Sequence, residues 1–208
     1  MKVAIIGAGK LGTSIARLLS KTHHVVMCFS TNQNKLIETA AELGVGWATP
    51  KDAVQDARVA ALTVPWSAIR TALAQAGQMD GKVLWDCTNP MNPDKTGLLV
   101  GTDCSAGETV AGIVPRALVV KAIPPFAELL EQPPEASGKM RSSVFICGDN
   151  AEAKTTVSAL VSELGADPVD AGPLTSARFT EPLGMLLVRL AYAQGFGGRI
   201  GAALVRYS

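Results

Sequence analysis

The chain begins with a short apolar run that passes directly into a glycine-rich turn. Residues 1–6 are apolar and partly β-branched, which is typical of a buried strand in a parallel sheet. Residues 7–12 read Gly-Ala-Gly-Lys-Leu-Gly, and residues 13–19 continue with the apolar spacing of a helix. A strand, a G-x-G-x-x-G turn and a helix in direct succession predict a dinucleotide-binding βα unit.

Each glycine of the turn has a predicted role. Gly7 permits the tight turn, Gly9 lets the backbone approach a diphosphate, and Gly12 lets the helix pack closely on the strand. The first N–H groups of the following helix are free to bind an anion. We therefore expect the three glycines to contact or shape a dinucleotide diphosphate.

Strands and helices alternate along most of the chain. The predicted strands are residues 24–29, a short piece near residue 47, and residues 59–64, 82–86, 117–121, 143–147 and 168–170. The predicted helices are residues 33–43, 50–57, 66–75, 105–113 and 151–164, with a proline-interrupted stretch at 124–138. This alternation predicts an α/β fold of the Rossmann type, doubly wound around a mostly parallel sheet.

The pattern changes near the C-terminus. From residue 175 onward it is helical, apart from a glycine-rich break at residues 195–198. We therefore expect a Rossmann dinucleotide-binding domain over residues 1–172 and a small C-terminal helical domain over residues 173–208. The apolar stripe formed by Leu183, Leu186, Leu187 and Leu190 favours core or a dimer surface over a cofactor site.

Composition narrows the possible partners. The 208 residues are 48% hydrophobic with a formal charge of +1, which gives no reason to expect a nucleic acid or membrane partner. No stretch is long and apolar enough to span a bilayer, and a strand at residue 1 predicts that no signal peptide is present. The four cysteines are scattered without metal-ligand spacing, so we expect no metal, buried thiols and a cytoplasmic location.

The tip of the second predicted strand distinguishes the two nicotinamide cofactors. An acidic residue there binds the ribose 2′-hydroxyl of NAD, but this chain has Ser30, Thr31 and Asn32 and no acid before Glu38. These side chains can donate hydrogen bonds to the 2′-phosphate of NADP, and Lys35 adds positive charge. They would equally serve as an N-cap for the next helix. Both roles are compatible, and we favour NADP.

Other strand tips also carry candidate ligand contacts, because ligands bind at the carboxyl ends of parallel strands. Val64, Pro65 and Trp66 follow one strand, and Asn89 follows the next. Trp66 either flanks a nicotinamide ring or packs as core. We expect the first three residues and Asn89 to contact the cofactor.

No acid–base residue can be named from the sequence. The histidines, His23 and His24, lie at the start of a strand, away from the ligand edge. Asp86 and Lys121 lie at strand tips, where they either form a buried pair that shapes the site or take part in catalysis. The catalytic residues are therefore unknown. Hydride transfer between two bound redox cofactors fits such a site, because no substrate hydroxyl must be deprotonated.

The chain resembles the coenzyme F420-dependent NADP oxidoreductases, and also the related dinucleotide domain of the STEAP metalloreductases. The resemblance spans nearly the whole chain and includes residues 62–66 (Leu-Thr-Val-Pro-Trp), 147–149 (Cys-Gly-Asp), 170–174 (Asp-Ala-Gly-Pro-Leu), 176–178 (Ser-Ala-Arg) and Glu181. It implies a Rossmann domain, a small helical domain, a homodimer and a deazaflavin that faces the nicotinamide between the domains. It also assigns residues 30–32 to the 2′-phosphate and residues 64–66 to the cofactor. The residues that it assigns to the diphosphate are Gly7, Gly9, Lys10, Leu11 and Gly12.

Two positions depart from the family pattern. The family has a pair of arginines where this chain has Thr31 and Asn32, and a histidine where this chain has proline, at or near Pro124. The first departure concerns the preference for NADP. The second concerns the identity of the electron partner, which is coenzyme F420, a flavin or another small acceptor. We expect an NADP(H)-dependent oxidoreductase. The alternatives are a dinucleotide-binding sensor with little turnover and a reductase of a small carbonyl or imine, with Lys121 or Asp86 as proton donor.

Overall fold

A computed structural model describes residues 1–101, 103–131 and 141–207, and in these residues it shows one eight-stranded sheet. The strand order is β3-β2-β1-β4-β5-β6-β7-β8. The strands are β1 (Lys2–Ile6), β2 (His24–Cys28), β3 (Gly46–Trp47), β4 (Val59–Leu62), β5 (Val83–Asp86), β6 (Leu118–Ala122), β7 (Ser143–Gly148) and β8 (Asp167–Asp170). This arrangement confirms the predicted Rossmann-type α/β fold.

The sheet is parallel except where β7 meets β6. Those two strands run antiparallel, with Lys121 opposite Cys147, whereas β7 and β8 form the parallel unit that the sequence predicted. A parallel neighbour needs a crossover that returns the chain to the opposite end of the sheet. The described connection contains only the short helix α6 (Ala127–Glu131), so the chain re-enters the sheet at the edge where β6 ends.

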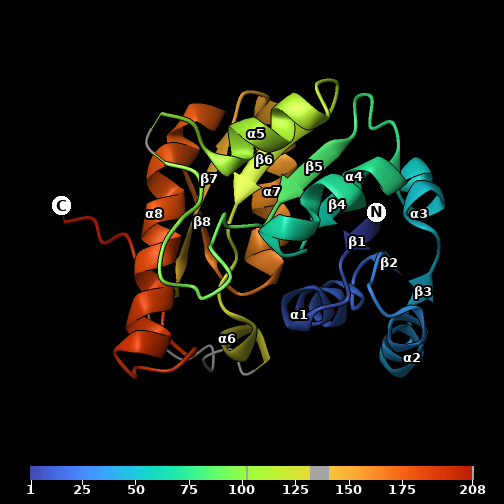
Figure 1. The fold of residues 1–208 in the computed structure, drawn as a ribbon, viewed down its shortest axis with the longest axis horizontal. Coiled ribbons are helices and arrows are strands. Elements are labelled where there is room, and N and C mark those ends of the chain that lie inside the picture. The colour runs from blue at the N-terminus through green and yellow to red at the C-terminus, as the bar shows by residue number, and fades with distance from the viewer. Residues whose placement is uncertain (102, 132–140, 208) are drawn as a thin grey trace.

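Helices cover both faces of the sheet. Figure 1 shows α3, α4 and α5 on one side and α1 and α2 on the other, with α8 at the β8 end. The helices are α1 (Lys10–Leu19), α2 (Gln33–Leu43), α3 (Pro50–Asp56), α4 (Ile69–Ala76), α5 (Ala106–Ile113), α7 (Ala151–Glu163) and α8 (Ala177–Val188), with 3₁₀ turns η1 (Trp66–Ala68) and η2 (Leu174–Ser176) and a π turn η3 (Arg189–Ala193).

Two hydrophobic cores follow from the alternation of side chains along the strands. In β1, Val3 and Ile5 belong to the same core as Ile15 of α1, whereas the alternate residues Ala4 and Ile6 belong to the same core as Leu73 of α4. The central strands contribute side chains to both cores and are therefore buried on both faces, which explains the continuous apolar runs in the sequence. The central strands are thereby held rigidly, and their carboxyl ends form a fixed edge for a site.

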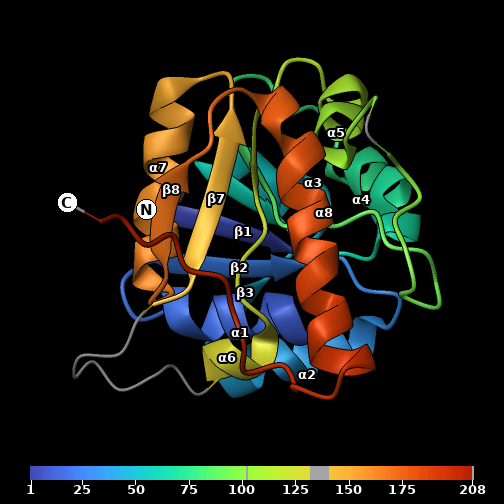
Figure 2. The same ribbon diagram turned by 90° about the vertical axis from the view of Figure 1, so that its left-hand side faces the viewer.

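The C-terminal segment corrects one expectation. Helix α8 continues as the π turn η3, but residues 199–207 are not helical. This segment instead crosses the start of β7, where the Ser143 N–H donates to the Ala202 carbonyl at 2.7 Å (Figure 2). Backbone groups that pair with a strand cannot also form helical hydrogen bonds. The division at residues 172 and 173 stays a prediction.

Smaller differences concern element boundaries. Helix α1 begins at Lys10, three residues earlier than expected, and the helix predicted at residues 66–75 is divided into η1 and α4. Within the proline-interrupted stretch the structure shows α6, while residues 132–138 lie outside the described residues. No helix in the described part of the chain has the length and apolarity to cross a membrane.

Candidate functional site

The glycine turn between β1 and α1 is packed against the end of β4. Gly7 has a φ of +129°, and a Cβ on Gly12 would lie 2.1 Å from the Gly7 carbonyl oxygen, so neither position accepts a side chain. The Thr63 hydroxyl donates to the carbonyls of Ile6 and Gly7, at 3.1 and 3.2 Å. Thr63 therefore locks the turn. Its role was missed because only the fold shows that β4 lies beside β1.

The start of α1 is open to a ligand. Gly9 is the N-cap residue with no side-chain hydrogen bond, and a Cβ at Gly9 would meet nothing within 4 Å. The first intrahelical bond runs from the Thr13 N–H to the Gly9 carbonyl, so the preceding N–H groups of the helix have no helical acceptor. These groups and the positive end of the helix dipole are suited to an anion such as a diphosphate.

The tip of β2 lies beside this turn, because Cys28 pairs with Ile6 in the sheet. Asn32 is the N-cap of α2, and its side-chain oxygen accepts from the Lys35 N–H at 3.1 Å. The Ser30 hydroxyl accepts from the Asn32 N–H at 3.1 Å. The capping interpretation is therefore confirmed. The Ser30 hydroxyl hydrogen and the Asn32 amide hydrogens remain suitable donors for a phosphate, and that role stays a prediction.

A cavity of about 750 Å³ extends from the glycine turn to α8. It is lined by residues 9–11, 63–67, 123–128, 142–145 and 200–202, with parts of the 87–99 loop and α8. Of the predicted cofactor residues, Gly9, Lys10, Leu11, Val64, Pro65, Trp66 and Asn89 line this cavity. Gly7, Gly12, Ser30, Thr31, Asn32 and Lys35 do not; the two glycines lie beneath the turn and the others at the β2 tip.

The far wall of the cavity is mostly apolar and comes from segments distant in sequence. Ile123 and the following prolines face α8, which contributes Leu183 and Leu187. The expectation of core or a dimer surface is therefore wrong for these two leucines, because α8 stands past the carboxyl ends of the central strands with one face toward the cavity (Figure 2). Leu186 on the outer face is 52% exposed.

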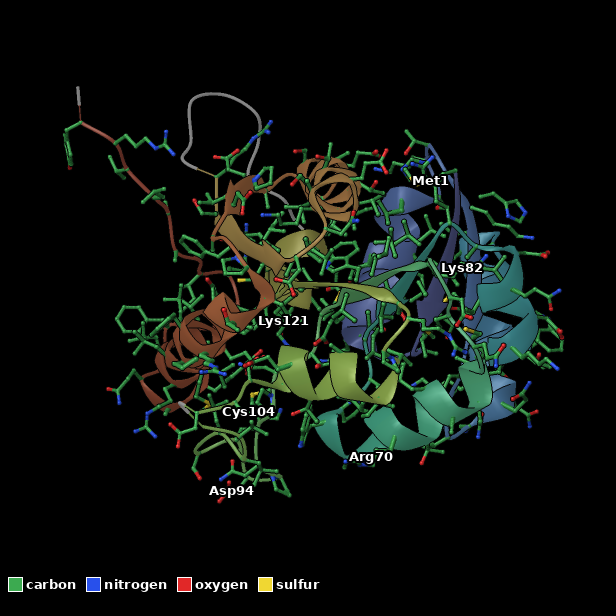
Figure 3. The ribbon with its side chains drawn as sticks, turned by 90° about the horizontal axis from the view of Figure 1, so that it is seen from above. Met1, Arg70, Lys82, Asp94, Cys104 and Lys121 are labelled. Carbon is green, nitrogen blue, oxygen red and sulfur yellow. The ribbon has the colours of Figure 1, made fainter. Side chains whose placement is uncertain are left out.

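A buried charge cluster lies behind this wall, between α8 and α5 (Figure 3). The Lys121 ammonium is 3.0 Å from Asp86 and 3.1 Å from Glu181, and it donates to the Thr88 carbonyl at 2.6 Å. Burial alone would lower the pKa of Lys121, but the two carboxylates outweigh it and raise that pKa. All three hydrogens of the ammonium have acceptors, and neither Lys121 nor Asp86 lines the cavity, which favours a shaping role over proton donation.

Glu181 was not expected in this cluster, although its motif was noted in the sequence. Its two carboxylate oxygens accept the N–H groups of Ala106 and Gly107 at the start of α5, at 2.9 and 3.0 Å. A second link joins the same helices, where Arg178 forms a bidentate pair with Glu108 at 2.9 and 2.6 Å. Helix α8 is thus fastened to the Rossmann sheet by charged contacts.

Asn89 lines the cavity and also contacts helix α8. Its amide nitrogen donates to the Glu181 carbonyl at 3.2 Å, and Gly184 allows α8 to pack directly on Asn89 and Ile123. The side-chain oxygen of Asn89 is buried without a hydrogen-bond partner. An unpartnered buried acceptor is costly, so this atom is suited to an N–H group of a bound ligand.

Both histidines lie away from the cavity, as expected. His24 is exposed, and His23 Nε2 lies 3.0 Å from Glu163 Oε1 at the end of α7. Neither residue lines the cavity. The site therefore combines an uncapped helix start with an apolar chamber, an arrangement typical of Rossmann proteins that bind dinucleotides.

Comparison with known proteins shows which proteins the chain resembles. Residues 2–90 match the family model described as NADP oxidoreductase, coenzyme F420-dependent. The F420-dependent NADP reductase of Methanothermobacter marburgensis is 28% identical over 211 residues, which cover 91% of this chain and 92% of that protein. A crystal structure from Arthrobacter sp. FB24, provisionally identified as an F420-dependent NADP reductase, has a TM-score of 0.87 and 28% identity, covering 99% of this chain and 100% of that one.

A further relative is longer than this chain. The metalloreductase STEAP3 of Rattus norvegicus is 30% identical over 190 residues, and the chain covers 37% of its length. The chain is therefore similar, in sequence and in fold, to the F420-dependent NADP oxidoreductases. The open space at Gly9 fits a diphosphate, and the unpaired side-chain oxygen of Asn89 fits a carboxamide. The residues present are therefore compatible with NADP.

Proposed function

We propose that this protein transfers hydride between NADP(H) and a flavin-like or deazaflavin acceptor, such as coenzyme F420, within the cavity. The observation that carries this proposal is the continuity of the cavity from the glycine turn to α8. A chamber of about 750 Å³ has room for the nicotinamide end of one cofactor and the ring of a second. NADPH, when bound, supplies the hydride.

The chain contributes binding and orientation in this proposal. The first turn of α1 holds the diphosphate, and Asn89 accepts a hydrogen bond from the nicotinamide carboxamide. The apolar wall formed by Ile123, Leu183 and Leu187 excludes water from the reacting rings. Positioning two reactants in this way can account for a large part of the rate without an acid–base residue.

Isotope transfer tests the proposal directly. NADPH carrying deuterium at C4 is incubated with the protein and coenzyme F420, FMN, riboflavin, or a small imine or ketone. We expect NADPH oxidation with a flavin-like acceptor and, for the deazaflavin, deuterium on the reduced ring carbon. Oxidation only with the imine or ketone would replace the proposal by the alternative reductase. Tight NADPH binding without turnover of any acceptor would indicate a sensor.

A matched variant checks the cofactor site in the same assay. Gly9→Val adds a side chain where the structure has open space, and the extended backbone of Gly9 (φ −79°, ψ 176°) accepts any residue. The variant should fold but lose NADPH binding, because the valine occupies the space expected for the diphosphate. Unchanged NADPH affinity would refute the diphosphate assignment.

We also propose a homodimer formed through the outer face of α8. Phe179, Pro182 and Leu186 share that face, and Phe179 and Leu186 are 77% and 52% exposed. Leu186→Glu should halve the mass measured by light scattering, whereas Trp47→Glu at the opposite sheet edge should not. A monomeric wild type would contradict the dimer.

We also propose a cytoplasmic location, which the four free thiols support.

A further inference from the structure

One cation, Lys95, lines the part of the cavity beside Tyr192. The Lys95 ammonium lies over the ring of Tyr192, 5.8 Å from the ring centroid. On the other side, the Tyr192 hydroxyl donates to Glu128 at 3.3 Å, and Phe126 packs edge-on against the same ring with centroids 5.8 Å apart. Lys95, Phe126, Glu128 and Tyr192 all line the cavity.

The backbone conformation of the turn at residues 92–97 determines where Lys95 lies. Lys95 has a φ of +58°, which is uncommon for a residue with a side chain. The Asn92 side-chain oxygen accepts the N–H groups of Thr96 and Gly97, at 2.8 and 3.1 Å, and so stabilises the tight turn. Arg189 of η3 donates to the Thr96 carbonyl at 3.3 Å. The turn is thereby attached to the helix that forms the far wall (Figure 3, beside Asp94).

The charges nearby do not neutralise Lys95. Within the described residues no carboxylate forms an ion pair with it, since Asp94 accepts from Thr96 and Glu128 accepts from Tyr192. The other lysine of the cavity, Lys10, belongs to the diphosphate end. Lys95 is exposed and lines the apolar cavity without an ion-pair partner among the described residues, so it is suited to an anionic group that projects from the cavity toward solvent.

We propose that Lys95 binds an anionic substituent of the hydride acceptor, so that the cavity prefers a phosphorylated or carboxylated flavin-like molecule over a neutral one with the same ring. This inference rests on the proposed function. Lys95 and Glu128 act on the substituent with opposite sign: the ammonium attracts it and the carboxylate repels it. The substituent is therefore expected on the ring side of Tyr192 rather than at its hydroxyl.

Equilibrium binding of two flavins tests the inference without requiring turnover. FMN and riboflavin share one ring and differ in a phosphate, and their binding to the NADP⁺-loaded protein is followed by flavin fluorescence. We expect FMN to bind about tenfold more tightly than riboflavin, as one partly exposed charge-assisted contact would provide. A carboxymethyl flavin shows whether a carboxylate serves as well as a phosphate.

Variants of the two charged residues sharpen the test. Lys95→Met should weaken FMN binding about tenfold while riboflavin binding stays unchanged, and Lys95→Arg should retain the preference. Glu128→Gln should strengthen FMN binding about twofold to threefold. Lys51→Met, on α3 and outside the cavity lining, is the control and should alter neither ligand.

The outcomes separate this inference from the proposed function. Equal affinity for the two flavins in the wild type, or an equal loss of both in Lys95→Met, would overturn the role of Lys95 even if both flavins oxidise NADPH. Selective FMN binding that Lys95→Met abolishes would support it even if no flavin is reduced. In that second case the proposed hydride transfer fails and the anion site stands.

Discussion

The two ends of the cavity are built in different ways. The end proposed for the nucleotide, called the nucleotide end, consists mainly of one continuous segment, residues 7–12, whose helix start is open to a ligand. The acceptor end combines the 92–97 turn, the chain after β6, helix α8 and the C-terminal segment, and side chains form its surface. One end therefore depends on local backbone geometry, and the other depends on how distant segments are held together.

Charged side chains hold the segments of the acceptor end together. Lys121, Asp86 and Glu181 form a buried cluster, and Glu108 with Arg178 forms a second link between α5 and α8. The nucleotide end has no such requirement, because Thr63 and the two glycines already fix the turn. Substitutions at the two ends should consequently separate NADPH binding from overall stability.

The cluster at the acceptor end should show the largest effect. Lys121→Met leaves two buried carboxylates without their cation, and we expect the free energy of unfolding at pH 7 to fall by about 3–5 kcal/mol. Urea denaturation measures this loss, and NADPH affinity of the remaining folded protein should change little. Lys82→Met, which removes hydrogen bonds to the Gln55 and Ala57 carbonyls at the surface, is the control. A loss below about 1 kcal/mol would show that the cluster does not hold α8 in place.

A substitution at the nucleotide end should have the second largest effect. Gly12→Ala places a methyl group 2.1 Å from the Gly7 carbonyl oxygen, so the turn must move. We expect a loss of about 2–3 kcal/mol in stability and a fall of at least about tenfold in NADPH affinity, measured by thermal unfolding and by titration. Gly112→Ala in α5, where nothing lies within 4 Å of the new Cβ, should leave NADPH affinity intact. Normal NADPH binding by Gly12→Ala would contradict the close packing of the turn.

The second link at the acceptor end should have the smallest effect, and it depends on pH. The hydrogen bond from Arg178 lowers the pKa of Glu108 from its ordinary value of 4.5 to about 2. Because the folded-state pKa is depressed, the Glu108 carboxylate stabilises the fold above pH 4.5, and this contribution is lost as the pH falls toward 2. Partial exposure of both side chains reduces the contribution to about 1–2 kcal/mol.

Glu108→Gln isolates that charge, since glutamine can still serve in the capping box with Ser105. The wild type should unfold at a higher temperature than the variant at pH 7, and the difference should shrink between pH 4.5 and pH 2. A difference that is independent of pH would mean that the Glu108–Arg178 pair contributes through packing rather than charge.

Much of the fold and one end of the site could be predicted from the sequence. The apolar runs located the strands and most helices, as at residues 105–113, where α5 begins after the capping box of Ser105 and Glu108. The pairing of Asp86 with Lys121 was also foreseen as one of two alternatives. Glu181 was not, because nothing in its local sequence indicates that α8 brings it to the same buried point.

The sequence by itself determined the βα unit at the N-terminus, because the glycines act on backbone angles and contacts within a few residues. Only the tertiary structure decided that β7 runs antiparallel to β6, that residues 200–202 line the cavity rather than continue a helix, and that Tyr192 meets both Lys95 and Glu128. These features depend on contacts between segments far apart in the chain. Local spacing cannot specify such contacts, because many sequences with the same pattern bring different residues together.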